Sequence, residues 1–292
     1  PIIFKVYAFF VAQSVTFANA NIDLGLTEGV PVEYHDFITW RRGDFKIDGT
    51  TISSGERIVP NHYVENNETT WFFGGSTTFG YGVRDEETYP AFFQEYTGSK
   101  VRNFGESGYI ARQSLSYLNN LLISENFETS NLKHIVFFDG VNDVAHRCRS
   151  EIAGLGTGRE TYIRNQLKSS QASNSEMFTF AKTFEQVIMF SRKVSDKFFT
   201  SQEEQSQRLI KHAYSCSQNE ERAKFIAKSI VTTWIQASHV AKARGIKFLA
   251  VLQPVSLLSN AINESVDKDH PNNKALKKQF EVVYPLILSY AE

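Results

Sequence analysis

One serine of this sequence has surroundings that suit nucleophilic chemistry. Ser76 lies in the run GGSTTFG at 74–80, directly after the apolar run TTWFF at 69–73. Glycines let the backbone turn sharply and let a substrate approach closely. A helix that starts at the serine would direct backbone N–H groups at a developing negative charge. The pattern indicates acyl transfer through a serine nucleophile.

Two further runs could donate hydrogen bonds to the same oxyanion. The run NFG at 103–105 ends in Gly105, whose N–H has no side chain in front of it, and the run GVND at 140–143 contains Asn142, whose side-chain amide is a donor. Three converging donors would form an oxyanion hole, in which each contributes on the order of 3 kcal/mol to the transition state. We therefore take Ser76, Gly105 and Asn142 as the candidate catalytic residues.

The elements that must position these residues predict an α/β fold. Apolar runs predict four strands, over 69–73, 101–104, 135–138 and 247–252. Helical spacing and helix-start signals predict helices over 88–96, 115–122, 176–200, 219–244 and 274–290. Alternating strands and helices predict a three-layer α/β/α sandwich with a mainly parallel sheet. Ligands bind beyond the carboxyl ends of strands in such sheets, and all three candidate runs lie there.

The 292-residue chain is expected to divide into an N-terminal lead-in over 1–65 and an α/β domain over 66–292. The lead-in begins with an apolar stretch over 2–12, which we interpret as a helix that packs on the domain or leans on a membrane; a signal-peptide remnant is the alternative. Short strands and loops follow. The run WRRGDF at 40–45 predicts arginines stacked on aromatic rings at the surface rather than a ligand site. Few apolar residues over 150–175 predict a mobile insertion.

The three candidate runs, in this order and spacing, resemble blocks I, II and III of the SGNH or GDSL-type serine hydrolases. The resemblance extends from Thr69 to the end of the sequence and implies an SGNH-hydrolase-like, flavodoxin-like domain. It implies that Ser76 is the nucleophile and that its own N–H, the N–H of Gly105 and the amide of Asn142 bind the oxyanion. The sequence departs from the family at Gly75, where an Asp is usual; that Asp is neither nucleophile nor base.

A serine hydroxyl needs a general base, and the sequence leaves its identity open. The resemblance implies a D-x-x-H pair after the last strand of the fold. Because that pair normally follows a further helix and strand, we expect it beyond Glu292, which would leave the chain as written inactive and its sheet with an exposed edge. Two runs have the right letters, DKDH from Asp267 to His270 and DVAH ending at His146, and they are the alternatives. A pseudoenzyme is the last alternative.

Composition narrows the classes of partner. The net charge of −1, with 31 Lys and Arg against 32 Asp and Glu, excludes nucleic acid as a main partner. We expect no cofactor and no metal, because the sequence has no phosphate loop, dinucleotide fingerprint or C-x-x-C pair. Cys148 and Cys216 are either two free thiols or one disulfide of an exported protein.

These observations predict an ester hydrolase that removes acyl groups, acetyl groups in particular, from a carbohydrate or a small ester. A glycan substrate is implied only by the resemblance and by no other feature of the sequence. An O-acyltransferase of cell-envelope glycans could use the same residues, and a catalytically inactive glycan-binding protein is the other alternative. The cell envelope, the periplasm or a membrane surface is favoured over the cytoplasm, and the apolar stretch over 2–12 could make a peripheral membrane contact.

Overall fold

The computed structural model describes residues 32–33, 35–36, 38–47, 49–124, 129–152, 154–157, 160, 214–259 and 268–292. Three expectations therefore fall wholly or mostly outside the described residues: the apolar stretch over 2–12, the helix over 176–200 and the insertion over 150–175.

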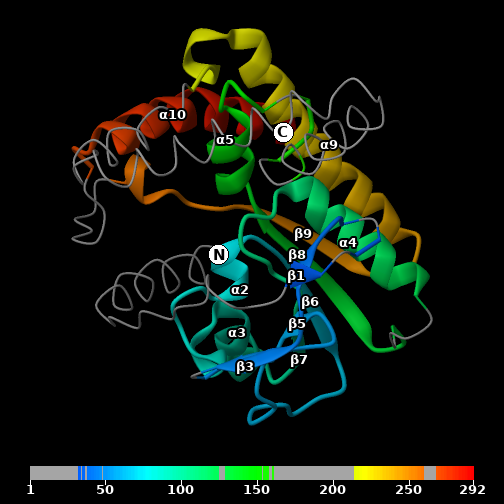
Figure 1. Ribbon diagram of the computed structural model, residues 1–292. Helices are drawn as coiled ribbons and strands as arrows, with labels where there is room; N and C mark the ends of the chain where they lie inside the picture. Colours follow the sequence, from blue (N-terminus) through cyan, green and yellow to red (C-terminus); the bar gives the residue numbers. More distant parts are fainter. Residues whose placement is uncertain are drawn as a thin grey trace, which may run out of the picture.

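A seven-stranded sheet forms the centre of the molecule, in the order β3-β4-β5-β7-β6-β8-β9 (Figure 1). Four of its strands lie side by side and run parallel to one another: β7 (Lys100–Asn103), β6 (Thr69–Gly74), β8 (Leu132–Asp139) and β9 (Lys247–Leu252). These are the four predicted strands, and the predicted bounds of β9 are confirmed without change. Within the described residues β9 is the edge strand on the side of β8, and its Leu249 is 47% exposed.

Helices cover both faces of this sheet, so the predicted three-layer α/β fold is confirmed. Phe72 of β6 and Val136 of β8 pack toward α3 (Tyr89–Thr97). Their strand neighbours Trp71 and Ile135 point to the opposite face, as the two-residue period of a strand requires. That face is covered by α4 (Ala111–Ile123), α9 (Glu220–Lys242) and α10 (Pro271–Ala291) (Figure 1).

Part of the lead-in belongs to the sheet. The short strands β3 (Phe45–Ile47), β4 (Thr50–Ser53) and β5 (Glu56–Arg57) pair antiparallel and extend the sheet beyond β7. A separate two-stranded ladder joins β1 (Val32–Glu33) to β2 (Arg41–Arg42).

The arginine pair of β2 lies in the interior, which corrects the expected surface location. The guanidinium carbon of Arg41 lies 4.2 Å from the centroid of the Tyr117 ring, so the expected stacking on an aromatic ring is present. Arg41 is fully buried, however, and the side chain of Arg42 is only 11% exposed. Arg41 packs on Tyr117 of α4, and Arg42 is covered in part by Glu106 of the loop after β7.

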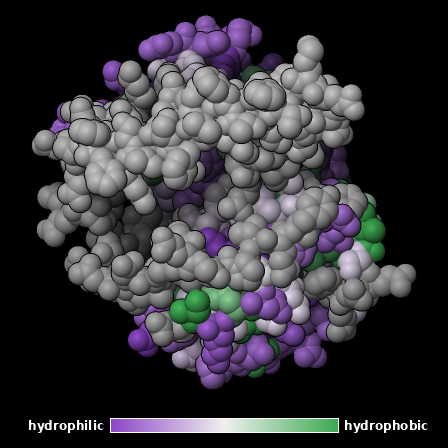
Figure 2. All heavy atoms as spheres, viewed as in Figure 1, coloured by the Kyte–Doolittle hydropathy of each residue, from purple (hydrophilic) through white to green (hydrophobic). Residues whose placement is uncertain are grey.

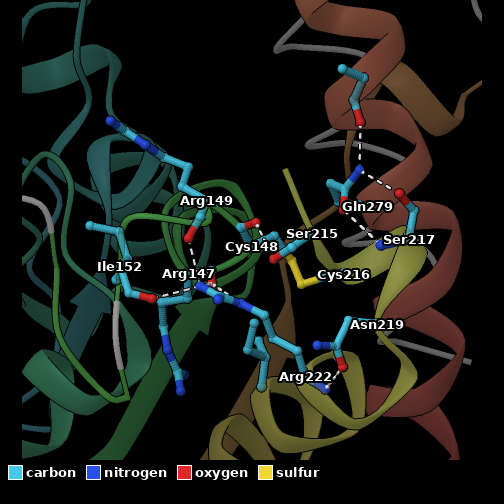
Figure 3. The surroundings of a disulfide bond; sticks show 12 residues. Arg147, Cys148, Arg149, Ile152, Ser215, Cys216, Ser217, Asn219, Arg222 and Gln279 are labelled. Carbon is cyan, nitrogen blue, oxygen red and sulfur yellow. Dashed lines mark hydrogen bonds between the residues drawn. A yellow bond between two sulfur atoms is a disulfide. The ribbon is translucent and has the colours of Figure 1, made fainter. Parts of the chain in front are cut away.

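Cys148 and Cys216 form a disulfide, so the paired alternative is correct (Figure 3). It links the end of α5 (Val141–Arg147) to the short helix η4 (Cys216–Gln218) that precedes α9. Beside it the guanidinium of Arg222 donates to three carbonyl oxygens of the turn after α5, those of Arg147, Arg149 and Ile152.

The coloured part of the face in Figure 2 is mainly hydrophilic, with apolar residues in small separate groups. Among the described helices, none combines the length and the hydropathy that crossing a membrane would require.

Candidate active site

Ser76 lies where the chain leaves the carboxyl end of β6. It is the first residue of the one-turn helix α2 (Ser76–Phe79), and its side chain is half-buried. The turn closes because the N–H of Phe79 donates to the carbonyl of Gly75 at 3.0 Å, and Gly80 ends it in the left-handed conformation at φ 80°. Among the described residues the Ser76 hydroxyl has no hydrogen-bond partner. The predicted nucleophile is therefore not committed to a structural bond.

Asn142 reaches the turn that precedes this serine. It lies at the start of α5, directly after β8, the strand beside β6. A Cβ built on Gly75 would lie 2.4 Å from the Nδ2 atom of Asn142, so the amide is in contact with the residue before Ser76. Nδ2 donates one hydrogen bond to the carbonyl of Tyr109 at 2.8 Å. An amide nitrogen carries two protons, so a second donor remains.

Gly105 lies against the nucleophile helix, but its N–H is already used. The N–H donates to Oδ1 of Asn103 at 3.0 Å, and Nδ2 of Asn103 donates to the carbonyl of Thr78 at 2.7 Å. A Cβ on Gly105 would lie 2.4 Å from the backbone nitrogen of Phe79. Gly105 therefore gives α2 room to pack on the end of β7, and its expected role as an oxyanion donor does not follow from this geometry.

A second glycine of the same loop, Gly108, was not among the expected donors and has the properties that Gly105 lacks. Its φ is +82°, a conformation that favours glycine, and a Cβ there would meet nothing within 4 Å. Among the described residues its N–H has no acceptor. The carbonyl of the next residue, Tyr109, accepts from Asn142. The second glycine of the run NFGESG at 103–108 was the available signal in the sequence.

Two buried carboxyl groups, those of Asp139 and Asp143, lie close to Asn142 in the sequence. Burial holds the pKa of Asp139 well above its usual 3.8, and the neighbouring Asp143 raises this pKa further; the hydroxyl of Ser114 donates to Asp139 at 3.1 Å and opposes the rise. Burial also raises the pKa of Asp143, against the opposing charge of Arg147. Asp143 accepts from the N–H of Ala111 at 3.0 Å, so it connects α5 to the start of α4.

The histidine candidates are not brought to the nucleophile by any contact within the described residues. His270 is exposed and precedes α10, where its Nδ1 accepts from the N–H of Asn272 at 3.3 Å. Its expected partner Asp267 lies outside the described residues. His146 lies on α5 and is half-buried. The identity of the base stays a prediction.

The loop after β9 reaches the residue that follows the nucleophile. Nε2 of Gln253 donates to the hydroxyl of Thr77 at 2.7 Å. The backbone of Gln253 is fixed at both groups, because its N–H donates to the carbonyl of Asp139 at 2.8 Å and its carbonyl accepts from the hydroxyl of Tyr284 at 2.8 Å. Thr77 and Gln253 therefore place a hydroxyl and an amide at the rim of the candidate site. In the part of the chain that the structure describes, no three His, Cys, Asp or Glu side chains are grouped as metal ligands would be.

Comparison with known proteins gives matches among solved structures. No family model and no curated protein matches the chain. A protein named as a lipolytic protein of the G-D-S-L family, from Desulfitobacterium hafniense DCB-2, is 17% identical, with 75% of this chain and 98% of that chain covered and a TM-score of 0.26. A protein named as a platelet activating factor, from Streptococcus pneumonia, is 13% identical, with 78% and 87% covered and a TM-score of 0.25.

Proposed function

We propose that this protein is an SGNH-type serine ester hydrolase that forms an acyl-enzyme on Ser76. The observation that carries the proposal is the contact of the Asn142 amide with the turn before Ser76. It joins the ends of two adjacent parallel strands, where a side-chain donor lies beside a half-buried serine whose hydroxyl has no hydrogen-bond partner among the described residues. A free hydroxyl beside a preorganised donor is the arrangement that acyl transfer requires.

In the proposed reaction, the Oγ of Ser76 attacks the ester carbonyl carbon and passes its proton to a general base. The carbonyl oxygen becomes an oxyanion, which the second N–H of Asn142, the N–H of Gly108 and the N–H of Ser76 stabilise. We assign Gly108 in place of Gly105 because the N–H of Gly105 is bonded to Asn103. Collapse expels the alcohol, which takes the proton from the base. Water then gives a proton to the base and attacks the acyl carbon, and the base returns the proton to Oγ as the acid leaves, which restores Ser76.

The proposed base is a histidine of a D-x-x-H pair. Within the sequence the run from Asp267 to His270 is the candidate. Substitution of His270 by Ala tests it: turnover that is abolished in this variant would identify His270 as the base, and turnover that persists would exclude it.

The proposed substrate is an acyl ester, in particular an acetyl ester, of a carbohydrate or small alcohol. The hydroxyl of Thr77 and the amide of Gln253 support a hydroxyl-bearing substrate, because they offer hydrogen bonds beside the nucleophile. The Cys148–Cys216 disulfide supports an oxidising compartment such as the cell envelope, because disulfides persist there and are rare in the cytosol.

Labelling with a fluorophosphonate probe tests the nucleophile. The wild-type protein should be labelled by the probe, and the Ser76→Ala variant should not. Ser256→Ala is the matched control, because Ser256 is also half-buried and also begins a short helix, η5 (Ser256–Leu258), beyond a strand end. Absence of labelling in protein shown to be folded by circular dichroism would contradict the proposal.

A further inference from the structure

Arg42 of β2 contacts both halves of the candidate site. Its guanidinium Nη1 donates to Oε1 of Glu106 and its backbone N–H donates to Oε2 of the same carboxylate at 3.1 Å. Glu106 lies in the loop that carries Gly108. The guanidinium carbon of Arg42 also lies 5.1 Å from the ring centroid of Phe79, the last residue of α2. One side chain thus joins the nucleophile helix to the loop beyond β7.

Glu106 organises that loop. It is fully buried, and its Oε1 also accepts from the N–H of Ser107 at 2.8 Å, one residue before Gly108. Its backbone N–H donates to the carbonyl of Gly74 at 3.0 Å, and its carbonyl accepts from the N–H of Tyr109 at 3.1 Å. A carboxylate so deeply buried needs a charged partner, and Arg42 is that partner.

The conformation of Gly108 depends on these neighbours. Gly108 has no side chain and a φ of +82°, and among the described residues its N–H has no acceptor that would fix its direction. The N–H of the preceding residue, Ser107, is held by the carboxylate of Glu106. The residue after it is held on two sides, because the hydroxyl of Tyr109 donates to the carbonyl of Trp40 and the carbonyl of Tyr109 accepts from Asn142. Residues 40–42 therefore support the loop on both sides of Gly108.

We infer that Arg42 is a positioning residue for the proposed reaction. Through Glu106 it fixes the N–H of Gly108, and through Phe79 it fixes α2, so it sets the position of the oxyanion donor relative to Ser76. The inference rests on the proposed function. It gives the lead-in a role in catalysis although Arg42 itself touches no substrate.

The test compares the steady-state hydrolysis of 4-nitrophenyl acetate by the wild-type protein and by its variants. Each is measured well below its melting temperature. Arg42→Gln removes the charge and should lower kcat at least about ten-fold with little change in KM, because a misplaced donor weakens transition-state binding more than substrate binding. Arg42→Lys keeps the charge near Glu106 and should recover part of kcat. Loss of stability alone would not produce a kcat effect that the conservative variant reverses.

Arg102→Gln is the matched control. Arg102 forms a half-buried ion pair with Glu56, with side-chain exposures of 19% and 18%, and its guanidinium lies 5.0 Å from the ring centroid of Phe104. It should lower stability and leave kcat unchanged. If Arg42→Gln does not fold, Arg42→Lys and Glu106→Gln decide the matter.

A folded Arg42→Gln or Glu106→Gln variant with wild-type kcat would overturn the inference while leaving the proposed function in place. An unlabelled and inactive wild-type protein would instead show that the proposed function is wrong.

Discussion

The side-chain amide of Asn142 occupies the space in which a side chain on Gly75 would have to begin. The distance from a Cβ at position 75 to the Nδ2 of Asn142 would be 2.4 Å, which real Cβ atoms essentially never show. A side chain at position 75 would therefore force the amide end of the Asn142 side chain to shift. Asn142 could not keep this position beside Ser76 if residue 75 were Asp.

Gly75→Ala should impair catalysis by moving Asn142. The φ of Gly75 is −85°, so alanine meets no backbone strain, and the clash with the amide is the main effect. Because loss of one oxyanion donor costs about 10²- to 10³-fold in kcat, we expect a decrease that approaches this range, measured by ester hydrolysis. In an Asn142→Ala background the same substitution should add little, since both changes act on one donor.

Gly82→Ala is the control for the glycine substitution itself. Gly82 has a φ of +85°, and a Cβ there would meet nothing within 4 Å, so alanine should cost about 1 kcal/mol of stability and leave turnover intact. Full activity in Gly75→Ala would show that the amide of Asn142 is not needed where the structure places it.

Removal of the disulfide should lower stability markedly. Cys148 and Cys216 are 68 residues apart in the sequence, and the chain-entropy model gives about 4 kcal/mol for a loop of that length. Urea unfolding should show this loss both in the Cys148→Ser, Cys216→Ser double variant and in the wild type under a reductant. The double variant should not respond to the reductant. Free thiols in denatured, unreduced wild-type protein would contradict the pairing.

Asp139→Asn should change how stability depends on pH. The pKa of Asp139 is raised in the folded state, so the folded protein binds this proton more tightly than the unfolded chain does. The stability that Asp139 contributes is therefore complete below its usual pKa of 3.8 and is lost as pH rises toward the folded value. Asparagine does not titrate and can still accept from Ser114. As pH rises above 3.8, the variant should thus lose less unfolding free energy than the wild type.

Asp269→Asn is the control for this measurement, because the side chain of Asp269 is 92% exposed. Its unfolding curves should follow those of the wild type. Parallel pH profiles for wild type and Asp139→Asn would show that Asp139 is not held protonated by its surroundings.

The layered fold and the strand ends could be predicted because the signals are local. Apolar runs such as 247–252 are bounded by polar residues, and parallel strands bring their carboxyl ends to one edge, so Ser76 and Asn142 were expected near each other. The role of Gly105 could not be predicted from its residue type, because its N–H donates a hydrogen bond to the side chain of Asn103. Sequence spacing does not show which of two glycines in a loop keeps a free donor.

The features that sequence reasoning missed depend on contacts between distant residues. An arginine pair usually indicates a surface, but the Arg42 side chain is only 11% exposed. Its partner Glu106 lies 64 residues further along the chain, so the pairing could not be foreseen from the sequence. Strands of two to four residues, such as β5, are too short to show a period, so their place in the sheet was not predicted. The sequence could not decide whether Cys148 and Cys216 pair, because they are 68 residues apart.

The disulfide also fixes the two ends of a long segment to each other. The Cα atoms of Cys148 and Cys216 are 5.2 Å apart, and a bridge between Arg149 and Tyr214 continues the contact on the loop side. The two ends of the segment between them are thus fixed to each other independently of how many residues the segment contains. This covalent link holds the end of α5, the helix that begins with Val141 and Asn142, beside the short helix that precedes α9.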